Sequence, residues 1–185
     1  LFSSDPAYYK ELKSPESIKI WDLYLVDTIL TDEQIILSWQ IDEINNIAYT
    51  NVCLLDFETG RIVADMKDEP HFLFERGQFP HDSYFQIHAK DQNYFSVGLS
   101  ASPQIQAIEF TGDGNYFPGT EVNISVSQLE GYNFIGWSGE NSGLLNDPYS
   151  QDTFFTMPTE HVQFTANFEE TVYSFTLNAS PLEAG

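Results

Sequence analysis

The stretch Leu99-Ser100-Ala101-Ser102-Pro103 returns as Leu177-Asn178-Ala179-Ser180-Pro181, 78 residues further along the chain. The residues before the two copies also correspond, since Phe95 aligns with Tyr173 and the same alternation of apolar and polar residues follows each of them. Such alternation predicts that each copy opens with a half-buried β-strand. A unit that recurs in this way is typical of stacked β modules and argues against a self-contained enzyme.

The composition is that of a globular and strongly acidic chain. Of its 185 residues, 42% are apolar and 15% are aromatic, which is enough for ordinary cores, and the formal net charge is −21. All seven basic residues lie within the first ninety positions, so the twelve acids from Asp91 onward are unopposed. A chain with this charge distribution is not expected to bind nucleic acid or anionic lipid through basic side chains.

The sequence also bears on compartment and membrane contact. Cys53 is the one cysteine and lies in an apolar stretch, which predicts a buried thiol without an internal disulfide. No apolar run approaches the length of a membrane helix, so we expect no membrane insertion. The first residues, Leu1-Phe2-Ser3-Ser4-Asp5-Pro6, carry no signal peptide, and we expect any export signal to lie upstream.

The N-terminal half has the pattern of a β-sandwich. Residues 1–16 are expected to be a linker or the tail of a preceding module, and residues 17–92 a domain of short strands separated by turns. The expected strands are 34–40, 48–55, 61–64, 71–75 and 83–89. In the last of these we expect Phe85, Ile87 and Ala89 to face the core, while Tyr84, Gln86 and His88 face water.

This half resembles a fibronectin type III domain over about residues 17–100. Ile36-Leu37-Ser38-Trp39 is similar to the second strand with its buried tryptophan, and residues 79–89 are similar to the approach to the sixth strand. The chain departs from the family at the tyrosine corner, because Phe85 at that position has no hydroxyl group. Another immunoglobulin-like sandwich is therefore an alternative.

The C-terminal half carries sharper motifs. Apolar residues alternate with polar ones from Val122 to Val126 and from Val162 to Phe168, which predicts two amphipathic strands. Around these strands several motifs follow in a fixed order: Gly114-Asn115-Tyr116, Gly119-Thr120-Glu121-Val122, Gly131-Tyr132-Asn133-Phe134-Ile135-Gly136-Trp137-Ser138-Gly139, Phe155-Thr156-Met157-Pro158 and Ala166-Asn167-Phe168. Together they resemble the divergent internalin-B-type B repeat of bacterial surface and secreted proteins.

The resemblance implies a small β-rich, β-grasp-like module that occurs in series within large extracellular polypeptides and has no assigned catalytic residues. We place this repeat at 93–171 and the start of a next copy at 172–185. The segment 94–101 has two interpretations, because it could close the first sandwich or open the repeat. The recurrence of the segment at 173–179 favours the second interpretation.

Residues with catalytic or metal-binding chemistry are present but not grouped. The four histidines, without zinc-type spacing, are His71, His81, His88 and His161. The acid pairs Asp42/Glu43 and Asp68/Glu69 could serve as glycosidase carboxylates, but chance neighbours are expected in so acidic a chain. No nucleophile elbow, phosphate loop or dinucleotide motif is present.

Calcium is the one cofactor that the sequence brings into consideration. Asp113 with Asn115, or Asp65 with Asp68 and Glu69, could supply oxygen ligands. Neither group has EF-hand spacing, so ordinary turn chemistry is the preferred interpretation.

The aromatic residues also have two interpretations. Tyr132, Phe134 and Trp137 could form a sugar-stacking platform, but in a small β module they are expected to fill the core. The tyrosines expected to be exposed are Tyr8, Tyr9, Tyr94 and Tyr149.

The sequence therefore predicts a mainly β protein in which an immunoglobulin or fibronectin III-like sandwich precedes a small β-rich repeat. We predict no enzyme and assign no catalytic, cofactor-binding or metal residues. The expected function is a stalk, spacer or adhesion segment of a large secreted or cell-surface bacterial protein. The alternative is an accessory carbohydrate-binding module of a secreted polysaccharide hydrolase. Expected partners are neighbouring modules of the same polypeptide and an unidentified protein or glycan.

Overall fold

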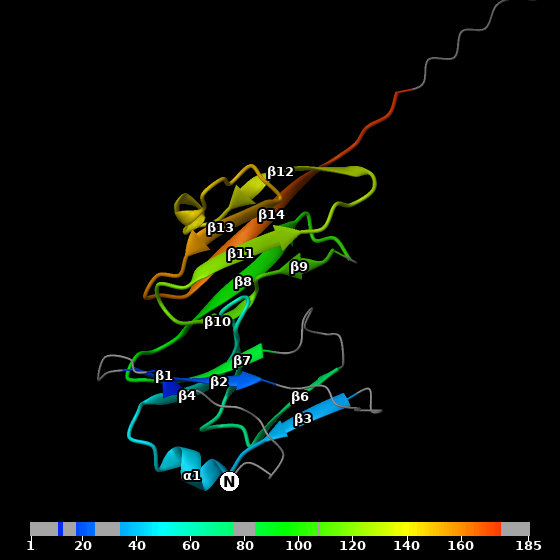
Figure 1. The fold of residues 1–185 in the computed structure, drawn as a ribbon. Helices are drawn as coiled ribbons and strands as arrows, with labels where there is room; N and C mark the ends of the chain where they lie inside the picture. Colours follow the sequence, from blue (N-terminus) through cyan, green and yellow to red (C-terminus); the bar gives the residue numbers. More distant parts are fainter. Residues whose placement is uncertain (1–10, 13–17, 25–33, 76–83, 107, 175–185) are drawn as a thin grey trace, which may run out of the picture.

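The computed structural model describes residues 11–12, 18–24, 34–75, 84–106 and 108–174. The chain is mainly β, as predicted, and its strands form two groups stacked one above the other (Figure 1). We call strands β1 to β7 the N-terminal module and strands β8 to β14 the C-terminal module. None of the helices in the described part of the chain has the length and apolar character that a membrane crossing would need.

The N-terminal module consists of two facing sheets. One has the strand order β1-β2-β7-β4-β5 and the other is the antiparallel pair β3-β6. The elements are β1 (Glu11–Leu12), β2 (Ile18–Tyr24), β3 (Gln34–Ser38), α1 (Ile41–Asn45), β4 (Asn51–Asp56), β5 (Ile62–Asp65), β6 (His71–Glu75) and β7 (Tyr84–Lys90). The five strands predicted at 34–40, 48–55, 61–64, 71–75 and 83–89 correspond to β3 to β7, with ends that differ by three residues at most.

The core of the N-terminal module lies between its two sheets. Its buried residues are Val52, Leu54, Ala64, Met66, Phe74, Phe85 and Ala89. Trp39 packs against this cluster, and its indole N–H donates a hydrogen bond to the carbonyl oxygen of Met66 at 3.0 Å. Phe85 and Ala89 are fully buried, so the core face predicted for the strand at 83–89 is confirmed.

The C-terminal module also has two layers. Its elements are β8 (Phe95–Ser102), β9 (Phe110–Thr111), β10 (Gly114–Tyr116), β11 (Glu121–Val126), β12 (Tyr132–Ser138), the 3-10 helix η1 (Ser142–Leu144), β13 (Asp152–Thr156) and β14 (Val162–Glu170). One layer has the order β10-β8-β14-β12, in which β8 and β14 run parallel. Because β10 also pairs with β5, this layer and the strands β1-β2-β7-β4-β5 form one nine-stranded sheet. The antiparallel sheet β13-β11-β9 is the other layer.

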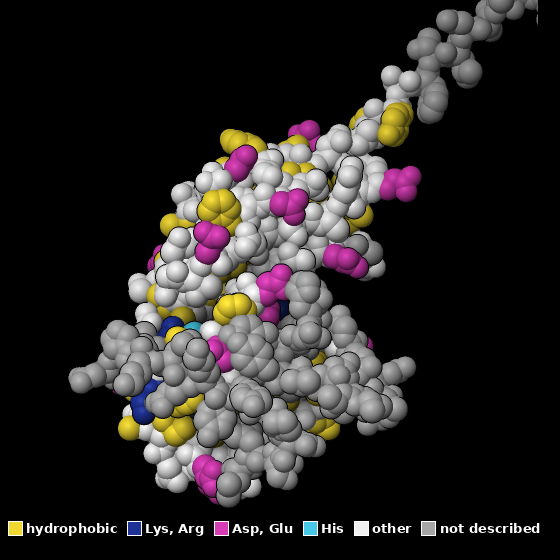
Figure 2. Space-filling model, viewed as in Figure 1, with side chains coloured by type: hydrophobic (Ala, Val, Ile, Leu, Met, Phe, Trp, Pro, Cys, Tyr) yellow, Lys and Arg dark blue, Asp and Glu magenta, His cyan; other side chains and the backbone are white. Residues whose placement is uncertain are grey.

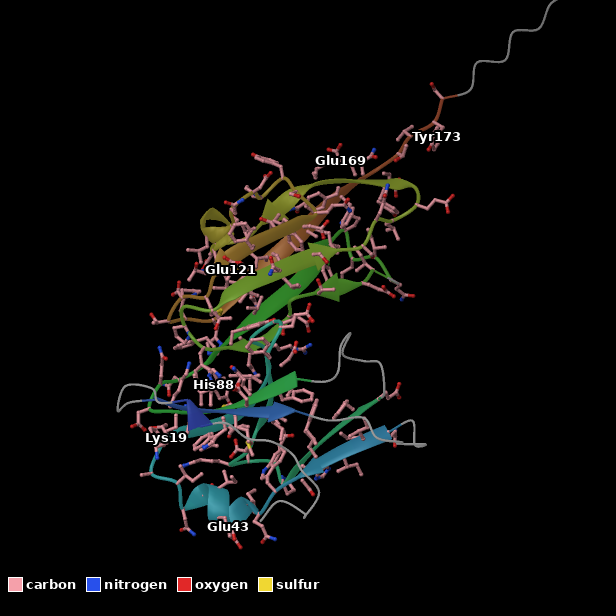
Figure 3. The ribbon with its side chains drawn as sticks, in the orientation of Figure 1. Lys19, Glu43, His88, Glu121, Glu169 and Tyr173 are labelled. Carbon is pink, nitrogen blue, oxygen red and sulfur yellow. The ribbon has the colours of Figure 1, made fainter. Side chains whose placement is uncertain are left out.

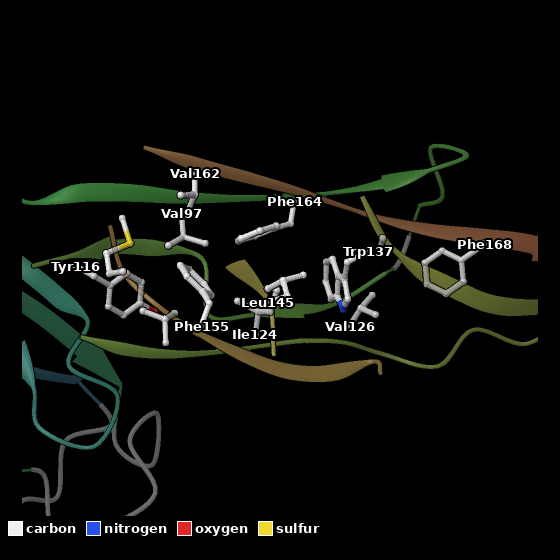
Figure 4. Packing of buried hydrophobic residues seen from close by; sticks show 13 residues of the cluster. Val97, Tyr116, Ile124, Val126, Trp137, Leu145, Phe155, Val162, Phe164 and Phe168 are labelled. Atoms are coloured by element: carbon white, nitrogen blue, oxygen red, sulfur yellow. The ribbon is translucent and has the colours of Figure 1, made fainter. Parts of the chain in front are cut away.

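Apolar side chains fill the space between these layers (Figure 4). Phe164 from β14 and Phe155 from β13 meet edge to face with ring centroids 5.1 Å apart. The residues of β14 alternate as predicted, because Val162, Phe164, Ala166 and Phe168 are all buried. Trp137 belongs to the same cluster, and Tyr132 and Phe134 pack against it, as expected of core aromatics.

The two hydrophobic interiors are distinct. Trp39 packs in the N-terminal cluster, whereas Trp137 and Phe164 belong to the C-terminal one. The ambiguous segment 94–101 lies in β8, which pairs with β10 and β14 rather than with a strand of the N-terminal module. Of the expected linker at 1–16, Glu11–Leu12 pairs with β2. In the expected next copy at 172–185, residues 175–185 lie outside the described part.

Candidate functional site: the junction between the two modules

The junction between the modules is the place where residues from distant parts of the sequence converge on one site. It has its own small cluster of buried apolar residues, Cys53, Leu55, Ile62 and Phe117, with Tyr94 packed against them. The first three come from β4 and β5, while Phe117 follows β10. In Figure 3 the label of His88 lies at the level where the two modules meet.

Phe117 is the apolar residue that the C-terminal module inserts into the junction. Only 1% of its surface is exposed. Its carbonyl oxygen accepts a hydrogen bond from the N–H of Thr120, and the N–H of Gly119 donates to the carbonyl oxygen of Met157 at the end of β13. The turn that carries Phe117 is therefore tied to the C-terminal module, while the ring is buried against the N-terminal one.

The outer face of β4 and β7 receives this ring. Cys53 of β4 is the register partner of His88 of β7, and the His88 imidazole is stacked on Phe117 with ring centroids 6.3 Å apart. Lys90 places its Nζ 4.3 Å from the centroid of the same ring, which is cation–π geometry. The prediction that Gln86 and His88 face water is therefore wrong for His88, because the C-terminal module covers that face.

Backbone pairing continues the sheet across the junction. Asn115 of β10 is the antiparallel partner of Ile62 of β5. Two glycines permit the close approach: a Cβ at Gly114 would lie 2.5 Å from Nε of Arg61, and one at Gly60 would lie 2.8 Å from Cγ2 of Thr120. Both glycines also have positive φ angles, which other residues rarely adopt.

The short connection between β7 and β8 is held to the N-terminal module by hydrogen bonds. Asp91 accepts bonds from both the backbone N–H and the hydroxyl of Thr50, at 2.8 and 3.1 Å. The side-chain amide of Asn51 donates to the carbonyl oxygen of Gln92 at 2.8 Å. The Tyr94 hydroxyl donates to Oδ2 of Asp65 at 3.2 Å, so the chain enters β8 from a fixed position.

Burial shifts the acid–base behaviour of the junction residues. Burial lowers the pKa of His88 to about 4, with help from the charge of Lys90 and against the charge of Asp22. Burial also raises the pKa of the Cys53 thiol far above its ordinary range and lowers that of Lys90. Burial and the neighbouring Asp65 raise the pKa of Tyr94 to about 12. Cys53 is thus a neutral thiol at physiological pH.

A polar chain lies beside the stacked rings. The Gln86 amide donates to Oδ1 of Asp22 at 2.9 Å, and Oε1 of Gln86 lies 2.8 Å from Nε2 of His88. Asp22 is buried although it is an acid. Nδ1 of His88 is buried and has no hydrogen-bond partner among the described residues.

The other histidines are not brought together. His71 is exposed at the start of β6, and His81 lies outside the described residues. His161 accepts hydrogen bonds at Nδ1 from the backbone N–H of Ser96 at 3.0 Å and pairs with its hydroxyl at 2.7 Å. Sequence reasoning missed this serine–histidine pair because β8 and β14 are far apart in the chain. The pair is exposed and joins β8 to the residue just before β14, so we interpret it as a structural contact between these two neighbouring strands.

The candidate acids are also dispersed. Asp42 and Glu43 lie in the first turn of α1, where their negative charges interact favourably with the helix dipole. Asp68 and Glu69 donate their backbone N–H groups to the carbonyl oxygen of Asp65 in the turn after β5. Asp113 and Asn115 are both exposed. Within the described ranges, no three His, Cys, Asp or Glu side chains are grouped as a metal site would require.

The tyrosines expected to be exposed differ in position. Tyr149 is 79% exposed, as predicted, whereas Tyr94 is partly buried in the junction, so the expectation for Tyr94 is wrong. Tyr8 and Tyr9 lie outside the described residues. Figure 2 shows acidic side chains spread over the visible face of the C-terminal module, with no basic side chain among them.

Comparison with known families supports the interpretation of the C-terminal half. Residues 105–172 match the family model described as the divergent InlB B-repeat domain. The match includes β9 to β14 and begins after β8. In the structure, however, β8 pairs with β14 and so belongs to the same sheet as that matched strand. Neither the curated proteins nor the solved structures contain a match to this chain.

Proposed function

We propose that this chain is a non-catalytic modular segment of a large secreted or cell-surface bacterial protein, in which it acts as a stalk or spacer. The observation that carries the proposal is the fixed junction, where Phe117 of a module matching the InlB B-repeat family is buried against the module before it. A spacer needs neighbouring modules that hold a constant relative orientation, because a loose joint would shorten the reach of the whole.

The domain division that we propose places a fibronectin III-like sandwich at 17–92, the repeat at 93–171 and the start of a further copy at 172–185. The separate hydrophobic clusters support this division. In an immunoglobulin-type sandwich the sixth strand lies beside the seventh. In this chain the strand compared with the sixth one is β7, and β7 lies between β4 and β2. The next strand along the chain, β8, pairs with strands of the C-terminal module instead. The N-terminal β2 thus occupies the place that β8 would otherwise fill.

Small-angle scattering on the whole chain tests the spacer function. We expect the native protein to fit a single elongated arrangement of the two modules, and Phe117→Ala to broaden the distribution of maximum dimensions. Phe154→Ala is the matched control, because this phenylalanine is 39% exposed on β13 and lies outside the junction cluster. Equal profiles for all three proteins would contradict a role of Phe117 in maintaining reach.

The second candidate function is that of an accessory carbohydrate-binding module, and the exposed ring of Tyr149 favours it. Exposed aromatic rings stack on sugars in many binding sites, and this ring lies against Gly136, whose added Cβ would approach Cδ1 of Tyr149 to 3.3 Å. Saturable retention on an insoluble polysaccharide that Tyr149→Ala abolishes would favour this function over the spacer.

A further inference from the structure

We propose that the contact between the two modules at the junction is sensitive to acid. The contact is closed while His88 is neutral, and it opens when His88 takes up a second proton. The inference concerns the contact between the modules, so it is independent of whether the segment acts as a spacer or binds a glycan.

The hydrogen bonds define the neutral form of His88. Nε2 of His88 lies 2.8 Å from Oε1 of Gln86, and the amide nitrogen of Gln86 is already used as a donor to Asp22. An amide oxygen only accepts hydrogen bonds, so the proton of the imidazole is on Nε2. Nδ1 is therefore the unprotonated nitrogen, and it is buried without a partner among the described residues.

A second proton would go to Nδ1, where the described residues of the closed junction offer it no acceptor. A buried N–H group without a partner is costly, and a buried charge costs more. The imidazolium would also lie under the ring of Phe117, which already has the ammonium group of Lys90 at 4.3 Å from its centroid. The closed junction therefore disfavours the charged imidazole on three grounds: burial, the missing acceptor and like charge.

The charged and titratable groups around His88 come from each element packed against it. Lys90, on β7 itself, opposes the added charge, and Asp22 of β2 favours it. Cys53 of β4 is directly opposite in register, and its raised pKa keeps it neutral. The C-terminal module contributes the uncharged ring of Phe117. The net effect of burial and these charges is the lowered pKa of His88, about 4.

Opening the junction removes the cause of this shift. Once Phe117 leaves, the imidazole is hydrated and its pKa returns toward the ordinary value of about 6.5. A proton then binds the open form more tightly than the closed form, so acid shifts the equilibrium toward opening. With a pKa of about 4 when closed and about 6.5 when open, the open-to-closed ratio rises roughly 20-fold between pH 7 and pH 5.

Cys53 provides a natural probe of this opening. It is the one cysteine in the chain, it is fully buried, and it lies in the junction cluster with Phe117. The experiment follows the reaction of Cys53 in the whole chain with 4,4′-dithiodipyridine from pH 7 to pH 5. Each rate is divided by the rate of glutathione at the same pH, which removes the ordinary dependence on thiolate concentration. We expect the normalised rate to rise by about 20-fold over this range.

Three variants make the test specific. His88→Gln keeps an N–H donor for Gln86 and His88→Phe keeps a ring against Phe117, but neither can take up the proton, so both should give flat profiles. His71→Gln removes an exposed histidine of the same module and should behave as the native protein does. A flat native profile, or an equal rise in the His88 variants, overturns the proposal. So does a rise that coincides with loss of the far-ultraviolet circular dichroism signal, because the protein would then be unfolding.

Discussion

Asn115 of β10 pairs antiparallel with Ile62 of β5, and this single register pair joins the sheets of two modules that have separate hydrophobic interiors. Beside it, the buried ring of Phe117 belongs to a cluster that includes Leu55, and the ring stacks on His88. A backbone pairing and a buried aromatic ring together restrict both the distance and the rotation between the modules.

The first prediction concerns Phe117. Truncating a fully buried phenylalanine to alanine typically costs about 3–5 kcal/mol. In Phe117→Ala we expect this loss to fall on the coupling between modules, so that one calorimetric transition separates into two. Phe154→Ala should leave the native transition intact. Two transitions in the native protein would show that the junction does not couple the modules.

The second prediction separates backbone strain from steric overlap at the glycines of the C-terminal module. Gly112 has a φ of 89°, and an added Cβ would lie 2.1 Å from the carbonyl oxygen of Asn123. Gly119 has a similar φ of 85° but no atom within 4 Å of that position. We expect Gly119→Ala to cost about 1–2 kcal/mol from the left-handed backbone alone, and Gly112→Ala to cost clearly more. Urea denaturation measures both, and equal losses would contradict this packing.

The third prediction is a pH dependence of global stability. The pKa of His88 is about 4 in the folded protein and is expected to be near 6.5 in the unfolded chain. Above pH 6.5 the group is neutral in both states and contributes no dependence. As the pH falls from 6.5 to 4, the unfolded state binds a proton that the folded state does not, so the free energy of unfolding decreases by roughly 3 kcal/mol.

Paired denaturation curves at pH 7.5 and pH 4.5 test this sign. The difference in unfolding free energy between the two pH values should be smaller in His88→Gln than in the native protein, because the carboxylates common to both cancel in the comparison. His71→Gln should retain the native difference. A larger pH effect in His88→Gln than in the native protein would reverse the predicted sign.

The fourth prediction uses two tryptophans that make the same kind of bond in different modules. The indole N–H of Trp137 donates to the carbonyl oxygen of Ser150, and that of Trp39 to Met66, each at 3.0 Å. Replacing either with phenylalanine leaves a carbonyl oxygen without its donor, at a cost of about 1–3 kcal/mol. In the Phe117→Ala background, Trp137→Phe should lower one transition and Trp39→Phe the other. If both substitutions lowered the same transition, the two interiors would not be separate.

Sequence reasoning predicted the strands better than it predicted what covers them. Alternation assigned Phe85 and Ala89 to a core, and both are fully buried. The same alternation assigned His88 to water, because a period of two residues distinguishes the two faces of a strand but not whether a second layer covers the outer one. Phe117, which lies 29 residues further along the chain than His88, supplies that layer from the next module.

Phe117 itself carried a local signal that could have been used. It lies in Phe117-Pro118-Gly119, a turn between two strands, where a large aromatic residue has no core of its own to enter. An aromatic ring at the tip of a turn in a repeat that packs against its neighbours indicates an intermodule contact. The pairing of Asn115 with Ile62 had no comparable signal, because long-range register depends on the tertiary arrangement.

We expect the two modules to keep one relative orientation because Phe117 is buried between them. Residual dipolar couplings of backbone N–H groups, measured at neutral pH, test it directly. We predict that couplings from both modules of the native chain fit a single alignment tensor, and that in Phe117→Ala the two modules require tensors of different magnitude. Two different tensors in the native protein, or one shared tensor in Phe117→Ala, would contradict the account.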